Sequence, residues 1–257
     1  MNERLFMGRA GIYHKCRPSY PKGLIDHLYT ELGFSEGSVI ADIGSGTGIF
    51  GRLLLERGSR VYSVEPNDDM RSVAKRELGG IPGFVSINAA AESTSLDDKS
   101  VDFVTAAQAF HWFDAEGFRQ ECSRILKKDG KVVIVWNVRD IGHDVVKKDF
   151  EARKKYSVGD AKGLTSTDNS IVDVGSFFLG EKVEELTFAN DLYLKRDDYI
   201  GMNLSRSYSP TEDAEPEKYF ALISALGDIF DEYSSNGVLI YPHVTKAYIG
   251  PVTAAKS

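Results

Sequence analysis

The sequence predicts a doubly wound α/β domain with a mostly parallel sheet. Three observations predict it. Apolar strand-like runs alternate with helix-like segments, a glycine-rich turn follows the first strand-like run, and the second strand-like run ends in an acidic residue. Strands that are connected through helices form βαβ units, in which the strands are parallel. At 257 residues the chain fits one such domain with an insertion, and it can bury a complete core.

The alternation of elements begins at residue 39. Predicted strands cover 39–43, 60–64, 84–88, 101–106 and 131–136, and predicted helices cover 49–57, 67–78, 114–126 and 144–156. Helical spacing of leucines also predicts a helix over 23–32. Towards the end we expect a strand within 183–192, helices near 196–206 and 215–233, and a β-like run over 238–249.

Two segments of the predicted single domain, residues 1–257, lie outside this alternation. Residues 1–38 carry aromatic and basic side chains around Pro18 and Pro21, which stiffen the segment, and we expect them to form an N-terminal lid. Residues 159–175 are rich in Gly, Ser, Thr and Asp with little periodicity. We place there a mobile part of a cap or substrate-specificity insertion within 140–235.

Composition and charge limit the kinds of molecule that the protein is expected to bind. The net charge of −7 and the pI near 5.3 disfavour nucleic acid, since binding a polyanion uses many Lys and Arg contacts to phosphates. Small-molecule or protein substrates are therefore favoured. We see no signal-peptide pattern and no apolar run long enough to span a membrane, so we expect a cytoplasmic protein. Cys16 and Cys122 lack metal-ligand spacing, the five histidines are scattered, and no metal site is predicted. The sequence does not indicate an oligomeric state.

The glycine-rich turn predicts a pocket for a nucleotide-like cofactor. Gly44, Gly46 and Gly48 let the backbone turn sharply and let a ligand approach, and the helix that follows offers unpaired N–H groups. Glu65 follows at about the 20-residue spacing at which an acid holds ribose hydroxyls. The spacing is G-x-G-x-G rather than the dinucleotide G-x-G-x-x-G, and Asp42 stands where nicotinamide enzymes usually have a small or apolar residue. A glycine turn without a ligand is the alternative.

Further polar candidates follow the strands. His111 and Trp112 lie in an aromatic segment after the fourth strand, where His111 is either a general base or hydrogen-bond donor, or a structural residue. Asp114 is a candidate helix cap. Arg139, after the fifth strand, either binds a substrate carboxylate or forms a salt bridge with a nearby acid. Three residues of the later chain can face the same cavity: Arg206, Tyr208 and His243.

Seven segments together carry a resemblance to a known family. They are R-P-S-Y-P (17–21), D-I-G-S-G-T-G (42–48), V-E-P-N-D-D-M (64–70), A-E (91–92), Q-A-F-H-W-F (108–113), L-K-K-D-G-K (126–131) and W-N-V-R-D (136–140). With these, the chain resembles class I S-adenosylmethionine-dependent methyltransferases, in the small-molecule group of the ubiquinone/menaquinone methylases and trans-aconitate methyltransferase-like proteins. The resemblance covers roughly residues 10–140. It implies a seven-stranded Rossmann-like methyltransferase sheet with an N-terminal lid and a cap insertion before the last strands.

The resemblance also implies roles for individual residues. The methionine part of S-adenosylmethionine would lie against Gly44, Ser45, Gly46 and Gly48, with Asp42 near its ammonium group. The other residues implied to bind the cofactor are Glu65 at the ribose, Pro66 and Met70 beside the adenine, Ala91 and Glu92 at the adenine edge, Gln108 beside the methyl donor, and Tyr20 from the lid. Tyr13, Arg17 and Tyr20 would close the site from the lid. With the polar candidates given above, the residues predicted to bind the substrate are Tyr13, Arg17, His111, Trp112 and Arg139. Family members more often carry glycine or aspartate where this chain has Asn88 or Ala89.

The predicted function is transfer of a methyl group from S-adenosylmethionine to a small-molecule acceptor by in-line displacement. A carboxylate acceptor needs no base, whereas a hydroxyl or an activated carbon makes His111 the candidate catalytic base. One alternative is an NAD-dependent oxidoreductase, which the glycine spacing and the lack of an evident Ser/Tyr/Lys set disfavour. The other is a non-catalytic S-adenosylmethionine-binding protein.

Overall fold

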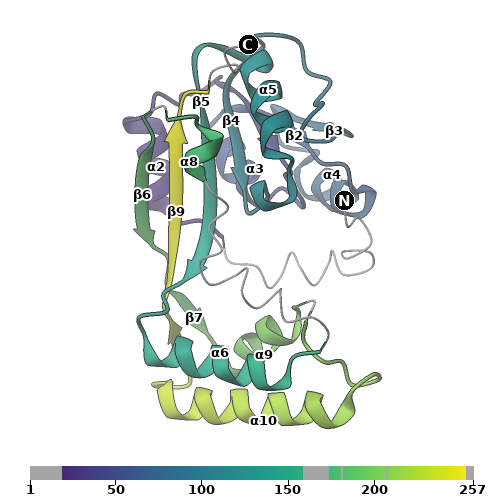
Figure 1. The fold of residues 1–257 in the computed structure, drawn as a ribbon, viewed down its shortest axis with the longest axis vertical. Coiled ribbons are helices and arrows are strands. Elements are labelled where there is room, and N and C mark those ends of the chain that lie inside the picture. The colour runs from purple at the N-terminus through teal and green to yellow at the C-terminus, as the bar shows by residue number, and fades with distance from the viewer. Residues whose placement is uncertain (1–18, 159–173, 181, 207, 253–257) are drawn as a thin grey trace.

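A computed structural model describes residues 19–158, 174–180, 182–206 and 208–252. They form a seven-stranded sheet with helices on both faces and a smaller, mainly helical layer at one end (Figure 1). The strand order is β3-β2-β1-β4-β5-β9-β6, in which β3 to β5 are parallel and β9 is antiparallel to both of its neighbours. The predicted doubly wound, mostly parallel Rossmann-like sheet is confirmed.

The elements of the first half lie where the sequence predicts them, within a few residues. They are α2 (Lys22–Thr30), β1 (Val39–Ile43), α3 (Ile49–Leu55), β2 (Arg60–Val64), α4 (Asp68–Leu78), β3 (Phe84–Ile87), β4 (Val101–Ala107), α5 (Ala115–Ile125) and β5 (Leu126–Arg139). Between β4 and α5 lies a short 3-10 helix that was not predicted, η2 (Phe110–Trp112). β5 begins earlier than predicted because Leu126 already pairs with Val101, and the register then shifts before Phe103 meets Lys131. Such a shift is typical of a β-bulge.

The second half differs more from the prediction. Its elements are α6 (Asp144–Tyr156), α8 (Val174–Phe177), β6 (Glu184–Ala189), β7 (Leu192–Leu194), α9 (Arg196–Leu204), α10 (Pro216–Tyr233), β8 (Leu239–Tyr241) and β9 (His243–Gly250). The single strand expected within 183–192 is two, with β6 in the main sheet and β7 paired to β8. The final run is interrupted at Pro242, which has no N–H to donate to a ladder.

Alternating side chains of the strands fill a core on each face of the sheet. In β1, Ile40 packs with Leu28 of α2 and Leu54 of α3, while Ile43 faces the side covered by α5 and α8. Helix starts are fixed by side-chain caps: Asn67 accepts from the Met70 amide, and Asp114 accepts from the Gly117 amide. The predicted cap at Asp114 is confirmed.

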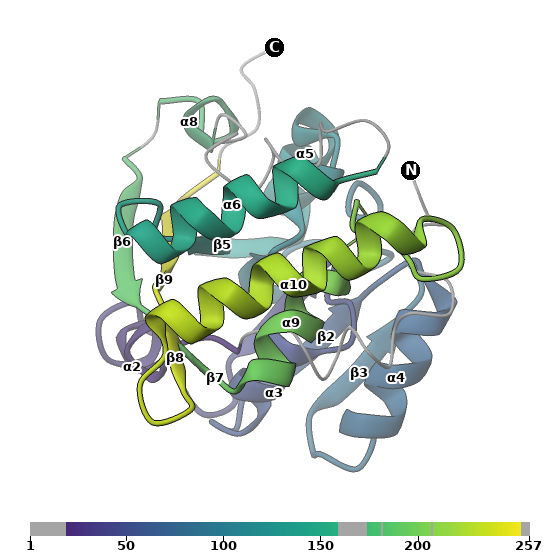
Figure 2. The ribbon, with the colours of Figure 1, turned by 90° about the horizontal axis from the view of Figure 1, so that it is seen from below.

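The cap layer, as we name α6, α9, α10, β7 and β8, has its own hydrophobic core. In two views at right angles, α6 and α10 lie side by side across one end of the sheet (Figures 1 and 2). The core is formed by Val145, Val146, Tyr199, Met202, Leu222, Leu226, Ile229, Phe230, Leu239 and Tyr241. Of the range 140–235, α8 and β6 instead belong to the body around the sheet. A role of this range in specificity stays a prediction.

Several other predictions concern segments of which the structure describes only a part. Residues 1–18 of the predicted lid, with Cys16, lie outside them, as does most of 159–175, whereas α2 packs on the sheet. Cys122 is a buried thiol outside any disulfide, and burial raises its pKa well above the ordinary value. No helix in the described ranges combines the length and apolar character needed to cross a membrane.

Candidate functional site

The loop between β1 and α3 has a backbone shape that glycine adopts readily. Gly44, Gly46 and Gly48 have φ values of +65°, +56° and +83°. The amides of Gly44 and Ser45 both donate to the carbonyl of Val64, at 2.8 and 3.2 Å. The loop is thereby fixed against the end of β2.

The three glycines differ in the space around them. A Cβ on Gly44 would lie 2.6 Å from the Cβ of Ala109, and one on Gly48 would lie 2.4 Å from Cδ1 of Leu78. A Cβ on Gly46 would meet no described atom within 4 Å. Protein therefore closes the first and third positions, and the second is open to a ligand.

Asp42 is a buried acid at the end of β1. Its Oδ1 accepts a 2.8 Å hydrogen bond from the Thr105 hydroxyl, while its Oδ2 is buried without a hydrogen-bond partner among the described residues. Burial, with a contribution from the charge of Glu65, raises the pKa of Asp42 to about 7, although the Thr105 hydroxyl and the nearby Gly51 amide favour the charged form. A cationic group of a ligand at Oδ2 would donate the missing hydrogen bond and would stabilise the ionised carboxylate.

Glu65 lies at the same loop. Its Oε2 accepts from the Gly46 amide at 3.0 Å, and its Oε1 accepts from the Asn67 amide at 2.9 Å. Arg71 fixes the backbone here, because its Nη1 donates to the carbonyls of Glu65 and Pro66 at 2.9 and 2.8 Å. Burial raises the pKa of Glu65 despite these amide donors. Each carboxylate oxygen retains lone pairs that can accept from a ribose hydroxyl.

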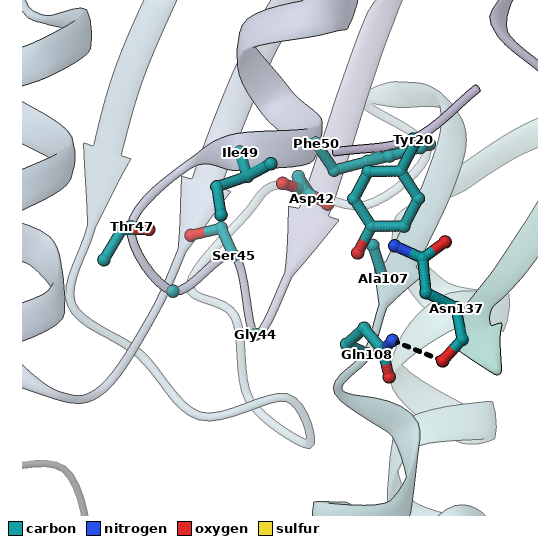
Figure 3. Close-up of a pocket in the computed structure, with 11 residues that line it drawn as sticks. Tyr20, Asp42, Gly44, Ser45, Thr47, Ile49, Phe50, Ala107, Gln108 and Asn137 are labelled. Atoms are coloured by element: carbon teal, nitrogen blue, oxygen red, sulfur yellow. Dashed lines mark hydrogen bonds between the residues drawn. The ribbon is translucent and has the colours of Figure 1, made fainter. Parts of the chain in front are cut away.

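A cavity of about 70 Å³ lies over the loop. It is lined by Tyr20, Asp42, Gly44, Ser45, Gly46, Thr47, Ile49, Phe50, Ala107, Gln108 and Asn137. Tyr20, whose ring packs edge-on against Phe50 at 4.9 Å, projects into it opposite Asp42 (Figure 3). The volume suits the compact end of a ligand rather than a whole nucleoside.

Gln108 is held in place at the far side of the cavity from the loop. It has a left-handed φ of +57°, which is uncommon for a residue other than glycine. Its amide N–H donates to the Val135 carbonyl at 2.8 Å, and its Nε2 donates to the Asn137 carbonyl at 2.9 Å (Figure 3). Backbone strain held by surrounding contacts is frequent at functional sites.

The residues predicted around the adenine lie near the ends of β2 and β3. Met70 and Ala91 are buried, and Glu92 accepts a 2.9 Å hydrogen bond from the Asp114 amide. Pro66 is partly exposed and stands between Glu65 and the start of α4. Their contact with an adenine stays a prediction.

The predicted substrate residues are not brought together at this cavity. His111 is exposed on η2 with its ring 4.8 Å from that of Trp112, which is 46% exposed, and neither lines the cavity. Arg139 is buried near Asp149 of α6, whose pKa its charge helps to lower. Tyr13 and Arg17 lie outside the described residues.

Several contributors were missed from the sequence, among them the cavity-lining residues Thr47, Ile49, Phe50 and Ala107. Asn137 lines the cavity, Thr105 bonds Asp42, and Arg71 supports Glu65. Asn137 was recognisable as a polar residue at the end of a parallel strand, where ligands collect. The bonds of Thr105 and Arg71 carry no sequence signal of their own. In the described part of the chain, no three His, Cys, Asp or Glu side chains gather as a metal site requires.

Comparison with known proteins agrees with this geometry. A family model described as a methyltransferase domain matches residues 41–134, which include the loop, Glu65 and Gln108. An uncharacterised methyltransferase of Mycobacterium tuberculosis strain H37Rv is 38% identical over 135 residues, which are 52% of this chain and 53% of that protein. An uncharacterised methyltransferase of Geobacillus sp. strain WCH70 is 33% identical over 145 residues, which are 49% of this chain and 67% of that protein.

Solved structures share the fold. A protein assigned as a type II methyltransferase from Anaeromyxobacter dehalogenans superposes with a TM-score of 0.63 at 21% identity, covering 91% of this chain and 95% of that one. The chain spans about half the length of the mycobacterial relative and two thirds of the Geobacillus one. It belongs to the class I S-adenosylmethionine-dependent methyltransferases. S-adenosylmethionine is the cofactor of this class.

Proposed function

We propose that the protein transfers the methyl group of S-adenosylmethionine to a small-molecule acceptor. The observation that carries the proposal is a pair of acids, the buried Asp42 and the half-buried Glu65, on two sides of the open Gly46 position. One acid suits an ammonium group and the other suits two ribose hydroxyls. S-adenosylmethionine carries both kinds of group, one on either side of its sulfonium.

The residues of the cavity fit that cofactor in distinct ways. Asp42 Oδ2 would accept from the ammonium group, and the backbone at Gly46 leaves room for the methionine chain. Glu65 would accept from the ribose hydroxyls while the Gly46 and Asn67 amides hold its carboxylate in place. When bound, the cofactor supplies an electrophilic sulfonium methyl group.

The protein's part in the reaction is alignment and exclusion of water. Gln108 is fixed by its hydrogen bond to the Asn137 carbonyl, and Tyr20 covers the same side of the cavity. An acceptor held against this wall would be aligned with the sulfonium methyl group that the bound cofactor would supply. Positioning of this kind supplies a large share of the rate enhancement of bimolecular transfers.

The acceptor decides whether a base is needed. A carboxylate is already ionised at neutral pH and attacks without losing a proton. A hydroxyl or an activated carbon needs a proton acceptor, and His111 remains our candidate for that role. We place the protein in the small-molecule group that its lid, Q-A-F-H-W and W-N-V-R-D segments resemble. Its acidic composition also favours such a substrate over nucleic acid.

Turnover tests the proposal directly. The protein is incubated with methyl-labelled S-adenosylmethionine and a panel of carboxylic acids, phenols and activated carbon acids, and labelled product is measured together with S-adenosylhomocysteine. We expect labelled product and S-adenosylhomocysteine in equal amounts. Glu65→Gln should lower the rate at subsaturating cofactor at least about tenfold, since it removes a charged hydrogen-bond acceptor. Glu56→Gln, an exposed acid at the end of α3, is the matched control and should leave the rate unchanged.

Two outcomes would contradict the proposal. Tight binding of the cofactor without transfer to any acceptor class would favour the non-catalytic binding protein. Equal loss of activity in Glu65→Gln and Glu56→Gln would mean that the cofactor is not held at Glu65.

A further inference from the structure

A buried ionic cluster lies in the cap layer, next to the end of β5. Asp149 and Arg153 of α6 both have fully buried side chains, and Nε of Arg153 donates to Oδ2 of Asp149 at 2.8 Å. The hydroxyls of Tyr199 and Tyr241 donate to the same carboxylate at 2.9 and 2.7 Å. Asp149 is therefore well satisfied, with three donors on its two oxygens.

Arg153 is not satisfied in the same way. Its Nη1 donates to the Tyr208 hydroxyl at 2.9 Å, but its Nη2 is buried with no hydrogen-bond partner among the described residues. A buried guanidinium nitrogen without an acceptor is unfavourable, and such groups in folded proteins call for an explanation. An acceptor that binds from outside the described residues provides one.

The charges of two more arginines, Arg139 and Arg206, also act on the Tyr208 hydroxyl. Burial opposes ionisation of Tyr208, yet the charges of Arg206, Arg153 and Arg139 hold the pKa of its hydroxyl below the ordinary value. Burial likewise raises the pKa of Asp149, and the charges of the same arginines outweigh it. The arginine charges therefore favour a negatively charged group at the Tyr208 hydroxyl. Arg206 is only half-buried, so the cluster reaches the surface of the described residues there.

The cluster is adjacent to the cofactor cavity through β5. Asn137, which lines the cavity, and Arg139 are two residues apart on the strand, so their side chains leave the same face about 7 Å apart. Their partners on β9, Thr245 and His243, share that face. An acceptor in the cluster would therefore lie on the cap side of the cavity.

We propose that Arg153, with Arg139 and Arg206, binds a carboxylate group of the methyl acceptor. The inference rests on the proposed function and names the substrate class of that site. A planar, singly charged carboxylate matches the guanidinium edge, and Nη2 supplies two donors to it. The negative charge of Asp149, which lies beside Arg153, repels a phosphate more strongly than a carboxylate because the phosphate carries more charge.

Binding of simple probes separates this inference from the proposed function. S-adenosylhomocysteine is first titrated into the protein by calorimetry. Succinate, benzoate, their amides succinamide and benzamide, and inorganic phosphate are then titrated into the loaded protein. We expect at least one acid to bind about tenfold more tightly than its amide, because a charged acceptor gains more from buried arginines than a neutral one.

Substitutions locate the binding. Arg153→Lys keeps a charge beside Asp149 but lacks the second nitrogen, so it should weaken the acid at least about tenfold without changing S-adenosylhomocysteine affinity. Arg206→Gln, at a half-buried position, should weaken acid binding about threefold or more. This second variant tests the subsite if Arg153→Lys does not fold. Arg196→Gln, an arginine of α9 paired with Asp231, is the matched control.

The possible results have different meanings. Amides that bind as well as acids, a preference for phosphate, no acid binding up to about 10 mM, or acid affinities unchanged in both cluster variants would each overturn the subsite. Acid binding that depends on Arg153 without any S-adenosylhomocysteine binding would keep the subsite and remove the proposed function.

Discussion

Asp42 combines burial, an incomplete set of hydrogen bonds and a neighbouring negative charge. In the ligand-free protein these hold its pKa at about 7, so a large part of the molecules carry it protonated at neutral pH. A cation at Oδ2 favours the ionised form. Binding of the cofactor's ammonium group is therefore coupled to loss of a proton.

The first prediction is that cofactor affinity depends on pH through Asp42. Below about pH 7 the free protein must lose the Asp42 proton to bind, so affinity for S-adenosylhomocysteine should fall by up to about tenfold for each pH unit. Calorimetry at pH 6 in buffers of different ionisation enthalpy should show proton release on binding. Asp42→Asn should bind weakly and lose most of the pH dependence. An affinity that stays constant from pH 8 to 5.5 would contradict the role given to Asp42.

The second prediction concerns stability. Between pH 3.8 and about 7 the folded protein binds the Asp42 proton more tightly than the unfolded chain does, so the free energy of unfolding falls as pH rises through that window. Asp42→Asn should stabilise the ligand-free protein at pH 8 by a few kcal/mol, at about 1.4 kcal/mol for each pKa unit, and have little effect near pH 4. Denaturant unfolding at pH 8 and near pH 4 measures these free energies for the wild type and for Asp42→Asn. Asp213→Asn, at an exposed position, is the control. A destabilised Asp42→Asn at pH 8 would be the contrary result.

At the level of elements, substitutions at two glycines of the loop from β1 to α3 should affect folding and cofactor binding differently. Gly44→Ala places a Cβ against Ala109 at a positive φ and should cost about 2–3 kcal/mol of unfolding free energy. Gly46→Ala has open space and should cost about 1 kcal/mol, yet it should reduce cofactor affinity because its methyl group enters the cavity. Denaturant unfolding and calorimetry on both variants check this third prediction. Gly80→Ala, outside the site and without a close neighbour, is the control.

How far the sequence predicts an element depends on how local its determinants are. The glycine loop and Glu65 follow from short-range rules on backbone shape and spacing, and the structure places them together. The bond from Thr105 to Asp42 joins residues far apart in the chain, and only the pairing of β1 with β4 makes it evident. The aromatic segment with His111 suggests a pocket wall by composition, whereas its 3-10 turn leaves His111 exposed.

At the scale of the whole molecule, the body and the cap layer have separate cores. The fourth prediction is that they differ in local stability. Leu226→Ala removes a fully buried side chain of the cap core and should cost about 2–5 kcal/mol. Hydrogen exchange should accelerate in α6, α9 and α10 much more than in β1 and β4. S-adenosylhomocysteine affinity should stay within about twofold of the wild type.

A matched substitution in the body distinguishes local from global unfolding. Val133→Ala, in the centre of β5, should accelerate exchange in the sheet strands as well. If Leu226→Ala accelerates exchange equally in all strands and helices, the cap layer does not unfold separately.

At the scale of the whole molecule, the sequence also predicts only a part of the fold. Strand and helix periodicity predict the sheet through β5, and the methyltransferase family model covers this same region. Beyond it, β6 returns to the main sheet while β7 pairs with β8, an arrangement that depends on long-range contacts rather than on local pattern. The grouping of Arg139 with Asp149 and Arg153 depends on how α6 packs, so the sequence suggested a salt bridge for Arg139 without identifying its partners.

Calorimetric titration with S-adenosylhomocysteine, with NAD as the competitor, is the most direct test of the site. Saturable binding to the wild type, at least about tenfold weaker binding to Glu65→Gln and no binding of NAD are the results we predict. Binding of NAD in preference, or no S-adenosylhomocysteine binding by the folded wild type, would contradict the assignment of this cavity to S-adenosylmethionine.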